Sequence, residues 1–225
     1  MHAAQMLLIA VCLLASGHLP AGEIGTCGHG RVELEASTAT ATDLRLACEA
    51  VSHGVGFLRA RGVEADATLR IRVVDELPSQ HGVISLGQFD PTHSEIRVLS
   101  LTDFRAACAD DPPFEISLSP EIYRSFIVHE VVHAVTHVAL AGRAVRRLDM
   151  EYLAYVAQLT SLPDDLRAQL IAASDTEGFE RAEQINAFVY FADPNRFGIM
   201  CYLHYQRPEN GDRYLRKILG RRSRQ

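Results

Sequence analysis

Alternating apolar and polar positions mark the first half of the chain, and helical spacing marks the second half. Alternation predicts strands, in chain order, at 31–38, 67–74, 83–89 and 95–100. The sequence DPTH at 90–93 is typical of a turn and predicts a hairpin between the last two strands. Apolar residues recur at helical spacing over 42–61. Up to about residue 105, the pattern therefore predicts a small antiparallel sheet with one helix.

The second half is predicted to be helical throughout. A helix begins at Ser119-Pro120-Glu121, which offers a cap residue, a proline at the first helical position and an early acid. It runs to about Leu140, because its length and capping outweigh the β-branched residues in its centre. Further helices are expected at 149–160, 163–173, 180–191 and 195–219, the last with a break near Pro208. Three aromatic residues are expected in the core of this half: Tyr190, Phe191 and Phe197.

These patterns predict an α+β fold in a single domain over 23–225. Its sheet lobe covers about 31–105 and its mostly helical lobe about 119–220. Hydrophobic residues make up 48% of the 225 positions and charged residues 22%, which excludes a disordered or low-complexity chain. The formal net charge of −6 argues against a protein that coats nucleic acid.

The N-terminal segment differs from the rest of the chain. Met6–Ala15 is a ten-residue apolar run, too short to span a bilayer, and small residues follow it. This pattern predicts a signal peptide over 1–22, a secreted or periplasmic protein and no membrane insertion after cleavage. The alternative is an N-terminal core helix or a retained anchor.

Four cysteines remain after residue 22, and an even number in an exported chain predicts two disulfides. No C-x-x-C spacing occurs, which argues against a zinc ribbon or a thioredoxin-type redox site. The favoured pairing is Cys27–Cys48, which closes the shortest loop, together with Cys108–Cys201.

The candidate chemistry lies in the sequence His129-Glu130-Val131-Val132-His133. Residues four apart on a helix share a face, so both imidazoles are able to reach one metal ion. Zinc accepts imidazole nitrogens and leaves a position for water, whose proton the neighbouring Glu130 is placed to take. A chain of this composition contains about 0.03 such motifs by chance. The alternative is a polar patch on an ordinary core helix, but burying these groups without a partner costs several kcal/mol.

A third zinc ligand is required, and His137 is one candidate. It lies eight residues after His129 and is therefore rotated by about 80° around the helix. The motif with a third downstream histidine places a glycine and that histidine where this chain has Thr136 and Ala139. One straight helix therefore does not direct all three rings at one ion.

Glu151 is the favoured third ligand. It lies 18 residues after His133, beyond the helix end suggested by Gly142 and at the start of a helix able to pack antiparallel to the first. Tyr155 and Gln158 share a face with Glu151, which indicates a ligand with supporting polar groups. The alternative for Glu151 is an acid favoured by the positive end of its helix.

The sequence HEVVH followed by EYLAYVAQ resembles compact gluzincins, zinc metallopeptidases with two helix histidines and a downstream glutamate. More loosely, the chain is similar to small exported bacterial proteins of that type without an assigned function. Residues 119–158 carry the resemblance. It implies zinc bound by His129, His133 and Glu151, with Glu130 as the general base.

The resemblance also implies a zincin-like fold whose edge strand, here within 83–100, holds an extended peptide. Many gluzincins have an aspartate four residues after the ligand glutamate, where this chain has Tyr155. No downstream motif singles out the residue that stabilises the oxyanion. The candidates are Tyr152, Tyr155, Tyr202, His204 and Tyr205.

The leading hypothesis is therefore an exported zinc-dependent peptidase that acts on peptides or proteins. A second hypothesis is a zinc-binding module without activity that binds a protein partner. A third is a structural protein that holds no metal. Stoichiometric zinc and chelator-sensitive hydrolysis distinguish the three.

Overall fold

The computed structural model describes residues 23–64, 68–77 and 86–220. Its strands are β1 (Glu23–Cys27), β2 (Gly30–Leu34), β3 (Leu69–Val74), β4 (Gly87–Asp90) and β5 (Glu95–Leu99). Its α-helices are α1 (Ala41–Arg59), α2 (Leu101–Ala107), α3 (Pro120–Ala139), α4 (Arg147–Thr160), α5 (Asp164–Ala173), α6 (Ala187–Ala192), α7 (Pro194–Gln206) and α8 (Gly211–Ile218). Two short 3-10 helices are η1 (Pro113–Glu115) and η2 (Ala182–Gln184). The chain is α+β, as predicted.

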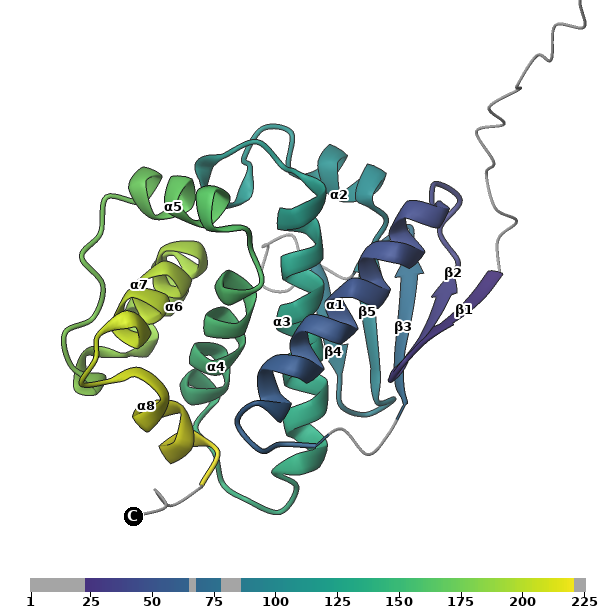
Figure 1. The fold of residues 1–225 in the computed structure, drawn as a ribbon. Helices are drawn as coiled ribbons and strands as arrows, with labels where there is room; N and C mark the ends of the chain where they lie inside the picture. Colours follow the sequence, from purple (N-terminus) through teal and green to yellow (C-terminus); the bar gives the residue numbers. More distant parts are fainter. Residues whose placement is uncertain (1–22, 65–67, 78–85, 221–225) are drawn as a thin grey trace, which may run out of the picture.

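The sheet is mixed, so the predicted antiparallel sheet is wrong. Its strand order is β1-β2-β3-β5-β4, with β4 at one edge (Figure 1). β2 pairs with β3, and β3 with β5, in parallel, whereas β1–β2 and β4–β5 are antiparallel. The parallel β2–β3 pair arises because α1 carries the chain back to the end of the sheet where β2 began. The predicted β4–β5 hairpin is confirmed for its described residues, while 83–85 lie outside them.

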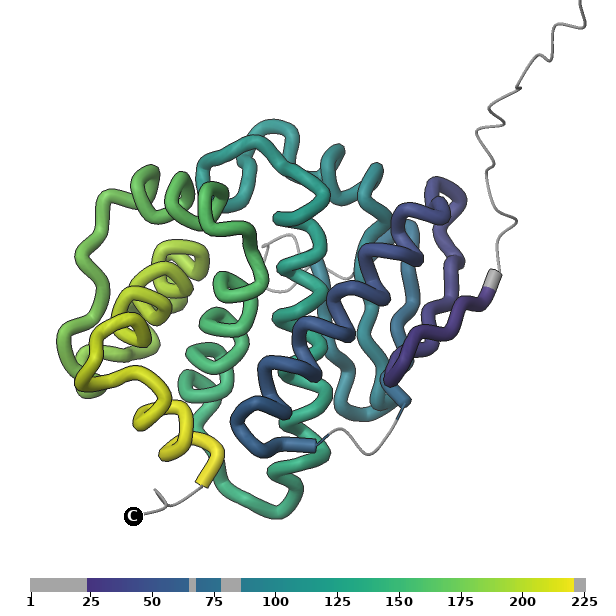
Figure 2. The backbone as a smooth tube through the Cα atoms, in the orientation of Figure 1, coloured from purple at the N-terminus to yellow at the C-terminus, as the bar shows by residue number. Residues whose placement is uncertain are grey.

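Helices α1 and α3 cover one face of the sheet (Figures 1 and 2). The side of α3 that faces away from the sheet packs against α4. Gly54 allows α1 to approach α3, because a Cβ at this position would lie 2.5 Å from Val131 Cγ1. α4 in turn packs against α7. α3 is therefore enclosed between the sheet lobe and the helical half, a name used below for α4–α8.

The alternation in β3 separates a buried face from a charged face. Ile71 and Val73 are fully buried beneath the helices. Arg70 is exposed on the opposite face, and Arg72 pairs there with Glu35. The predicted half-buried strand is thus confirmed, although its first predicted residue lies outside the described residues.

The predicted helix from Ser119 to about Leu140 and the predicted helices over 149–160 and 163–173 are confirmed, as is the break near Pro208 between α7 and α8. The predicted helix over 180–191 is wrong, because this segment forms η2 and the separate helix α6. The Asn186 side chain accepts a hydrogen bond from the Val189 amide (3.2 Å) and thereby begins a new helix. The sequence did not predict β1 or α2.

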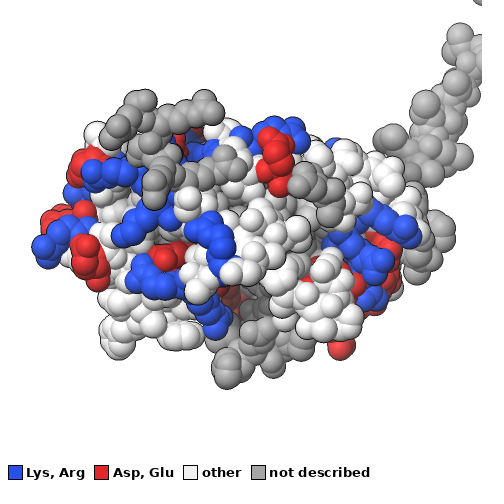
Figure 3. All heavy atoms as spheres, turned by 90° about the horizontal axis from the view of Figure 1, so that it is seen from below, with Lys and Arg blue, Asp and Glu red and all other residues white. Residues whose placement is uncertain are grey.

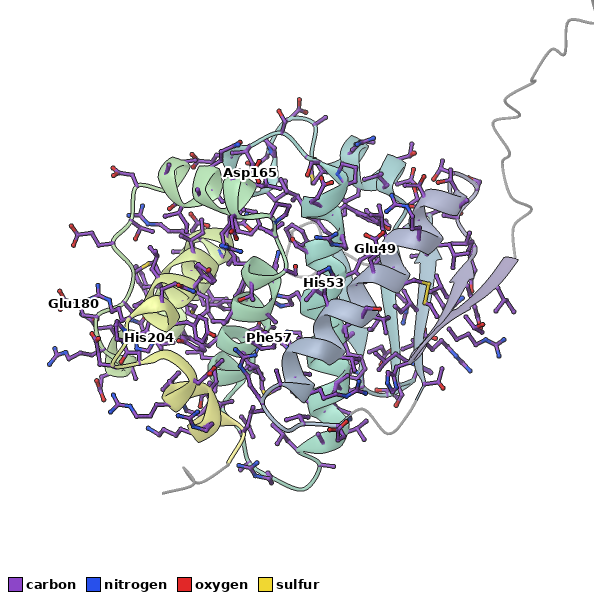
Figure 4. All side chains as sticks on the ribbon, viewed as in Figure 1. Glu49, His53, Phe57, Asp165, Glu180 and His204 are labelled. Carbon is purple, nitrogen blue, oxygen red and sulfur yellow. A yellow bond between two sulfur atoms is a disulfide. The ribbon has the colours of Figure 1, made fainter. Side chains whose placement is uncertain are left out.

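The disulfide Cys27–Cys48 is confirmed and ties β1 to α1 (Figure 4). The predicted bond between Cys108 and Cys201 is wrong, since both are free and buried. Cys108 ends α2, which packs on α3 and β5, whereas Cys201 lies in α7, which packs on α4. The two cysteines therefore belong to different parts of the core.

The predicted signal peptide lies outside the described residues. Within the described parts of the chain, none of the helices is both long and apolar enough to cross a bilayer.

Candidate metal centre

Helix α3 holds both motif histidines on one face. Ser119 caps the helix by accepting a hydrogen bond from the Ile122 amide (3.3 Å), and Pro120 occupies its first turn. His129 and His133 are one turn apart, and their ring centroids are separated by 4.7 Å. His129 is 8% exposed, so its ring lies between α3 and the helical half rather than in solvent.

Glu151 on α4 completes a triangle with these histidines. The two Nε2 atoms are 3.0 Å apart, and Glu151 Oε2 lies 3.4 Å from His129 Nε2 and 3.6 Å from His133 Nε2. A tetrahedral ion bound at zinc distances requires its donor atoms to be about 3.3 Å apart. The three side chains therefore fit zinc in donor type and in spacing.

The charges of this triangle are coupled. Burial alone would raise the pKa of Glu151, but the neighbouring imidazoles of His129 and His133 outweigh it and hold this pKa well below its usual range. Burial alone would lower the pKa of His133, but the neighbouring carboxylate of Glu151 outweighs it and raises this pKa. Without a cation, a proton on His133 balances the buried carboxylate. A divalent ion supplies the same positive charge.

A second layer of polar side chains fixes the ring of His129. Its Nδ1 donates to Gln158 Oε1 (3.0 Å), and Gln158 Nε2 donates to Ser125 Oγ (3.4 Å). Tyr155 packs edge-on against the same ring, with 4.6 Å between centroids. Because Nδ1 is occupied, Nε2 is the nitrogen presented to Glu151 and His133.

Glu130 points towards the sheet edge. Its Oε2 accepts a hydrogen bond from the backbone N–H of Phe89 in β4 (2.8 Å). Gly87 makes this approach possible, because a Cβ there would lie 3.2 Å from Glu130 Cγ. The carboxylate therefore contacts the edge strand, and Glu130 lines the same cleft as the two histidines.

The triangle forms part of the floor of a cleft of about 1350 Å³. β4 and α3 line one side, η1 closes one end, and α4, α6 and the start of α7 line the rest. Along α3 the lining extends from Phe126 to Leu140, a distance of about 21 Å at 1.5 Å per residue. An extended chain of about six residues has this length.

The η1 end of the cleft has a strained backbone. Phe114 and Glu115 have φ angles of 60° and 58°, a left-handed conformation that is costly for residues other than glycine. The Phe114 ring is 4% exposed and packs on Phe126, with 5.9 Å between centroids. This packing holds the strained turn at the cleft wall.

A profile of a family of unknown function, DUF6639, matches residues 34–223. The match spans most of the chain and includes Glu130 and all three members of the triangle. The chain belongs to DUF6639. Comparisons with curated proteins and with solved structures gave no match.

In this DUF6639 chain, Tyr155 is the one predicted oxyanion candidate that lines the cleft. Tyr152 donates to or accepts from His204 Nδ1 (2.7 Å), and Figure 4 shows His204 among the helices of the helical half. Tyr205 accepts a hydrogen bond from Arg61 (2.8 Å). Tyr202 lies in a small apolar cluster and is not part of the cleft lining. Burial, with the charge of Glu151, raises the pKa of Tyr155 well above its usual range, so its phenol keeps its proton.

Tyr190 is half-buried and packs against the core, as predicted, and it also lines the cleft. The prediction that Phe191 lies in the core is wrong, because Phe191 is an exposed part of the cleft lining. Phe191 is 69% exposed, whereas Phe197 is fully buried as predicted. Burial and the charge of Glu151 raise the pKa of Tyr190 to about 12. A tyrosine on a short helix gives no sequence signal for such a position, because only the packing of α6 against α7 creates it.

The other predicted ligand candidate, His137, also lines the cleft, one turn beyond His133. Its ring packs against Phe89 with 5.4 Å between centroids. It therefore contributes to the wall beside β4, whereas the cluster of ligand atoms comprises His129, His133 and Glu151.

Proposed function

We propose that this protein is a zinc-dependent peptidase in which His129, His133 and Glu151 hold the metal. The triangle of donor atoms, with sides of 3.0, 3.4 and 3.6 Å, is the observation that carries the proposal. Two neutral imidazoles and one carboxylate are a donor set found in catalytic zinc sites. Gln158 supports it by fixing the orientation of His129 (3.0 Å).

Bound zinc would lower the pKa of a coordinated water to about 7 and polarise a carbonyl group. Glu130 takes the proton of the attacking water and passes it to the nitrogen of the departing amine. The water oxygen becomes bonded to the carbonyl carbon as the C–N bond breaks, so one carboxylic acid and one amine are formed. The hydrogen bond from the Phe89 amide (2.8 Å) holds the Glu130 carboxylate in place for both transfers.

The shape of the cleft favours a peptide over a small compact substrate. The lining continues along α3 on both sides of the histidines, and β4 at the sheet edge forms one wall (Figure 1). An extended peptide is able to lie along such a wall with its backbone beside the strand. The phenols of Tyr155 and Tyr190, both protonated at neutral pH, are the donors available for the developing oxyanion.

Export of the protein is part of this proposal. A disulfide between Cys27 and Cys48 persists in an oxidising compartment and not in the cytosol. The apolar run Met6–Ala15 provides the pattern of a signal peptide. The proposed location is therefore secreted or periplasmic.

The test compares the wild type with Glu130→Gln and a matched control, Glu121→Gln, in the first turn of the same helix. We expect one zinc per chain in all three, and chelator-sensitive cleavage of denatured, fluorescein-labelled casein by the wild type and the control. Glu130→Gln is expected to lower the rate at least 100-fold, the contribution of a general base. Zinc without any cleavage would instead identify a zinc-binding module without activity, and a chain without stoichiometric zinc would exclude both functions.

A further inference from the structure

Arginine side chains gather around the start of α4, at one end of the cleft. Seen from below, Lys and Arg side chains gather over the helical half, with some Asp and Glu among them, and a further group lies over the sheet (Figure 3). Arg146 is paired with both oxygens of Asp149 (2.9 and 2.6 Å). Arg143 donates to the Leu219 carbonyl (2.7 Å). Both guanidinium groups are therefore already engaged by the protein.

Arg147 differs from these two arginines. Its side chain is 69% exposed and lines the cleft. Among the described residues its nearest carboxylate is Glu151, whose Oε1 lies 3.8 Å from Arg147 Nε. This separation exceeds hydrogen-bond distance, so the guanidinium keeps its donors for another partner. Glu151 presents its other oxygen, Oε2, to the histidines, which places Arg147 directly beside the proposed metal site.

Tyr190 supports this position of Arg147. The guanidinium carbon lies 5.8 Å from the centroid of the Tyr190 ring, within the range of a cation–π interaction. Tyr190 itself is held against Phe197, with 5.2 Å between ring centroids. Arg147 thus lies at the cleft beside the Tyr190 ring, in an ion pair with Glu151 that is longer than a hydrogen bond.

The opposite end of the cleft, around η1, carries two acidic side chains, and the exposed Arg196 at the start of α7 also belongs to the cleft lining. Asp111 and Glu115 are exposed in the cleft lining around η1, next to Phe126. η1 lies near Phe126, on the N-terminal side of the histidines of α3. Arg147 lies in the first turn of α4, which follows the C-terminal end of α3. The acidic pair and Arg147 therefore lie on opposite sides of the histidines. A substrate carboxylate is attracted to the Arg147 end and repelled by the η1 end.

We infer that Arg147 is a subsite for a substrate carboxylate, so that the preferred substrates carry a negative charge within about two residues of the cleaved bond. This inference rests on the proposed function. Glu151 Oε2 is the proposed metal ligand, and Arg147 Nε is 3.8 Å from the other oxygen of the same carboxylate. Because an extended peptide advances about 3.3 Å per residue, the distance fits the first or second residue from the metal. A chain-terminal carboxylate and an acidic side chain both provide this chemistry, and a guanidinium binds either through two parallel hydrogen bonds.

The test uses hydroxamate probes, which bind zinc directly and are not cleaved. One pair is a succinyl hydroxamate of phenylalanine with either a free carboxylate or a carboxamide at its end. A second pair replaces phenylalanine by aspartate or asparagine, both with a carboxamide end. The dissociation constants are measured by titration calorimetry on the zinc-loaded full-length chain. Within each pair the zinc-binding group is identical, so any change in the metal site cancels in the ratio of affinities.

The wild type is expected to bind the charged member of at least one pair about tenfold more tightly than the neutral member. The pair that shows this ratio identifies a chain-terminal or a side-chain carboxylate as the preferred group. Arg147→Gln is expected to reduce the ratio to about one, and Arg147→Lys to keep part of it. Arg70→Gln, at an exposed arginine on β3 outside the cleft lining, is the control and should match the wild type.

Equal binding of charged and neutral probes by the zinc-loaded wild type would overturn the inference alone, as would an unchanged ratio in Arg147→Gln. Absence of binding by every probe to a zinc-loaded chain would also overturn it. Zinc content is measured on each sample, and a wild type without zinc would overturn the proposed function together with the inference.

Discussion

Gln158 provides a direct test of how the candidate metal site is organised. This side chain is fully buried and accepts the Nδ1 proton of His129 at 3.0 Å. Gln158→Leu removes the acceptor while keeping nearly the same volume, so the cost of a cavity stays small. The His129 ring is then free to rotate, and its buried N–H has no protein partner.

The structure separates two effects of this substitution. Loss of a hydrogen bond to a metal-binding histidine lowers metal affinity by about 10- to 100-fold, or about 1.4–2.8 kcal/mol. Without metal, the unpaired N–H of His129 lowers the free energy of unfolding by about 1–3 kcal/mol. Ser125 adds little to this cost, because its hydroxyl also donates to the Ile122 carbonyl (2.7 Å).

Zinc affinity is measured by competition with a chromophoric chelator, and the stability of the metal-free chain by denaturant unfolding. The visible spectrum of the cobalt-substituted chain reports the ligand geometry. Gln158→Glu is the matched variant, since it keeps an acceptor oxygen at the same position, and it should bind zinc within a few-fold of the wild type. Zinc affinity within twofold of the wild type in Gln158→Leu, with an unchanged cobalt spectrum, would refute the role assigned to Gln158.

Two further predictions concern the edge strand and the disulfide. Gly87→Val should lower the rate of casein hydrolysis and leave zinc content unchanged, because the new side chain displaces Glu130 from β4. The control is Gly56→Ala, which should have no effect because a Cβ at position 56 meets nothing within 4 Å. Equal rates in Gly87→Val and the wild type would contradict the contact between Glu130 and β4. Cys48→Ser should lower the free energy of unfolding by about 3 kcal/mol, the loop-closure contribution for a sequence separation of 21 residues. Denaturant unfolding checks this value, and the addition of reductant to the wild type should reproduce it.

Patterns over a few residues correctly predicted the features that depend on neighbouring positions in the sequence. Helical periodicity and the cap at Ser119 predicted α3, and the spacing of His129 and His133 placed both rings on one face. The position of Glu151 on the next helix was also predicted, because two sequential helices joined by a short loop pack side by side. The prediction failed for the pairing of Cys108 with Cys201, which depends on how distant parts of the chain pack. The break within 180–191 has a local cause, the cap at Asn186, which the helical pattern alone did not reveal.

The direction of the sheet strands shows the same limit. Alternation identified β2 and β3 as half-buried strands but contains no information about which strand lies beside which. The pairing became parallel because α1 returns the chain across the sheet, and this depends on the contact between α1 and α3.

The sequence by itself determined an α+β chain with a buried HExxH helix, a following helix that carries Glu151, and one disulfide near its start. These features depend on spacings of a few residues, which the geometry of a helix or a short loop converts directly into positions in space. Only the tertiary structure placed β4 against Glu130, Gln158 against His129, and Tyr190 with Arg147 at the edge of the cleft. These contacts join segments that are 29 to 43 residues apart, and they are set by how whole elements pack rather than by any local pattern.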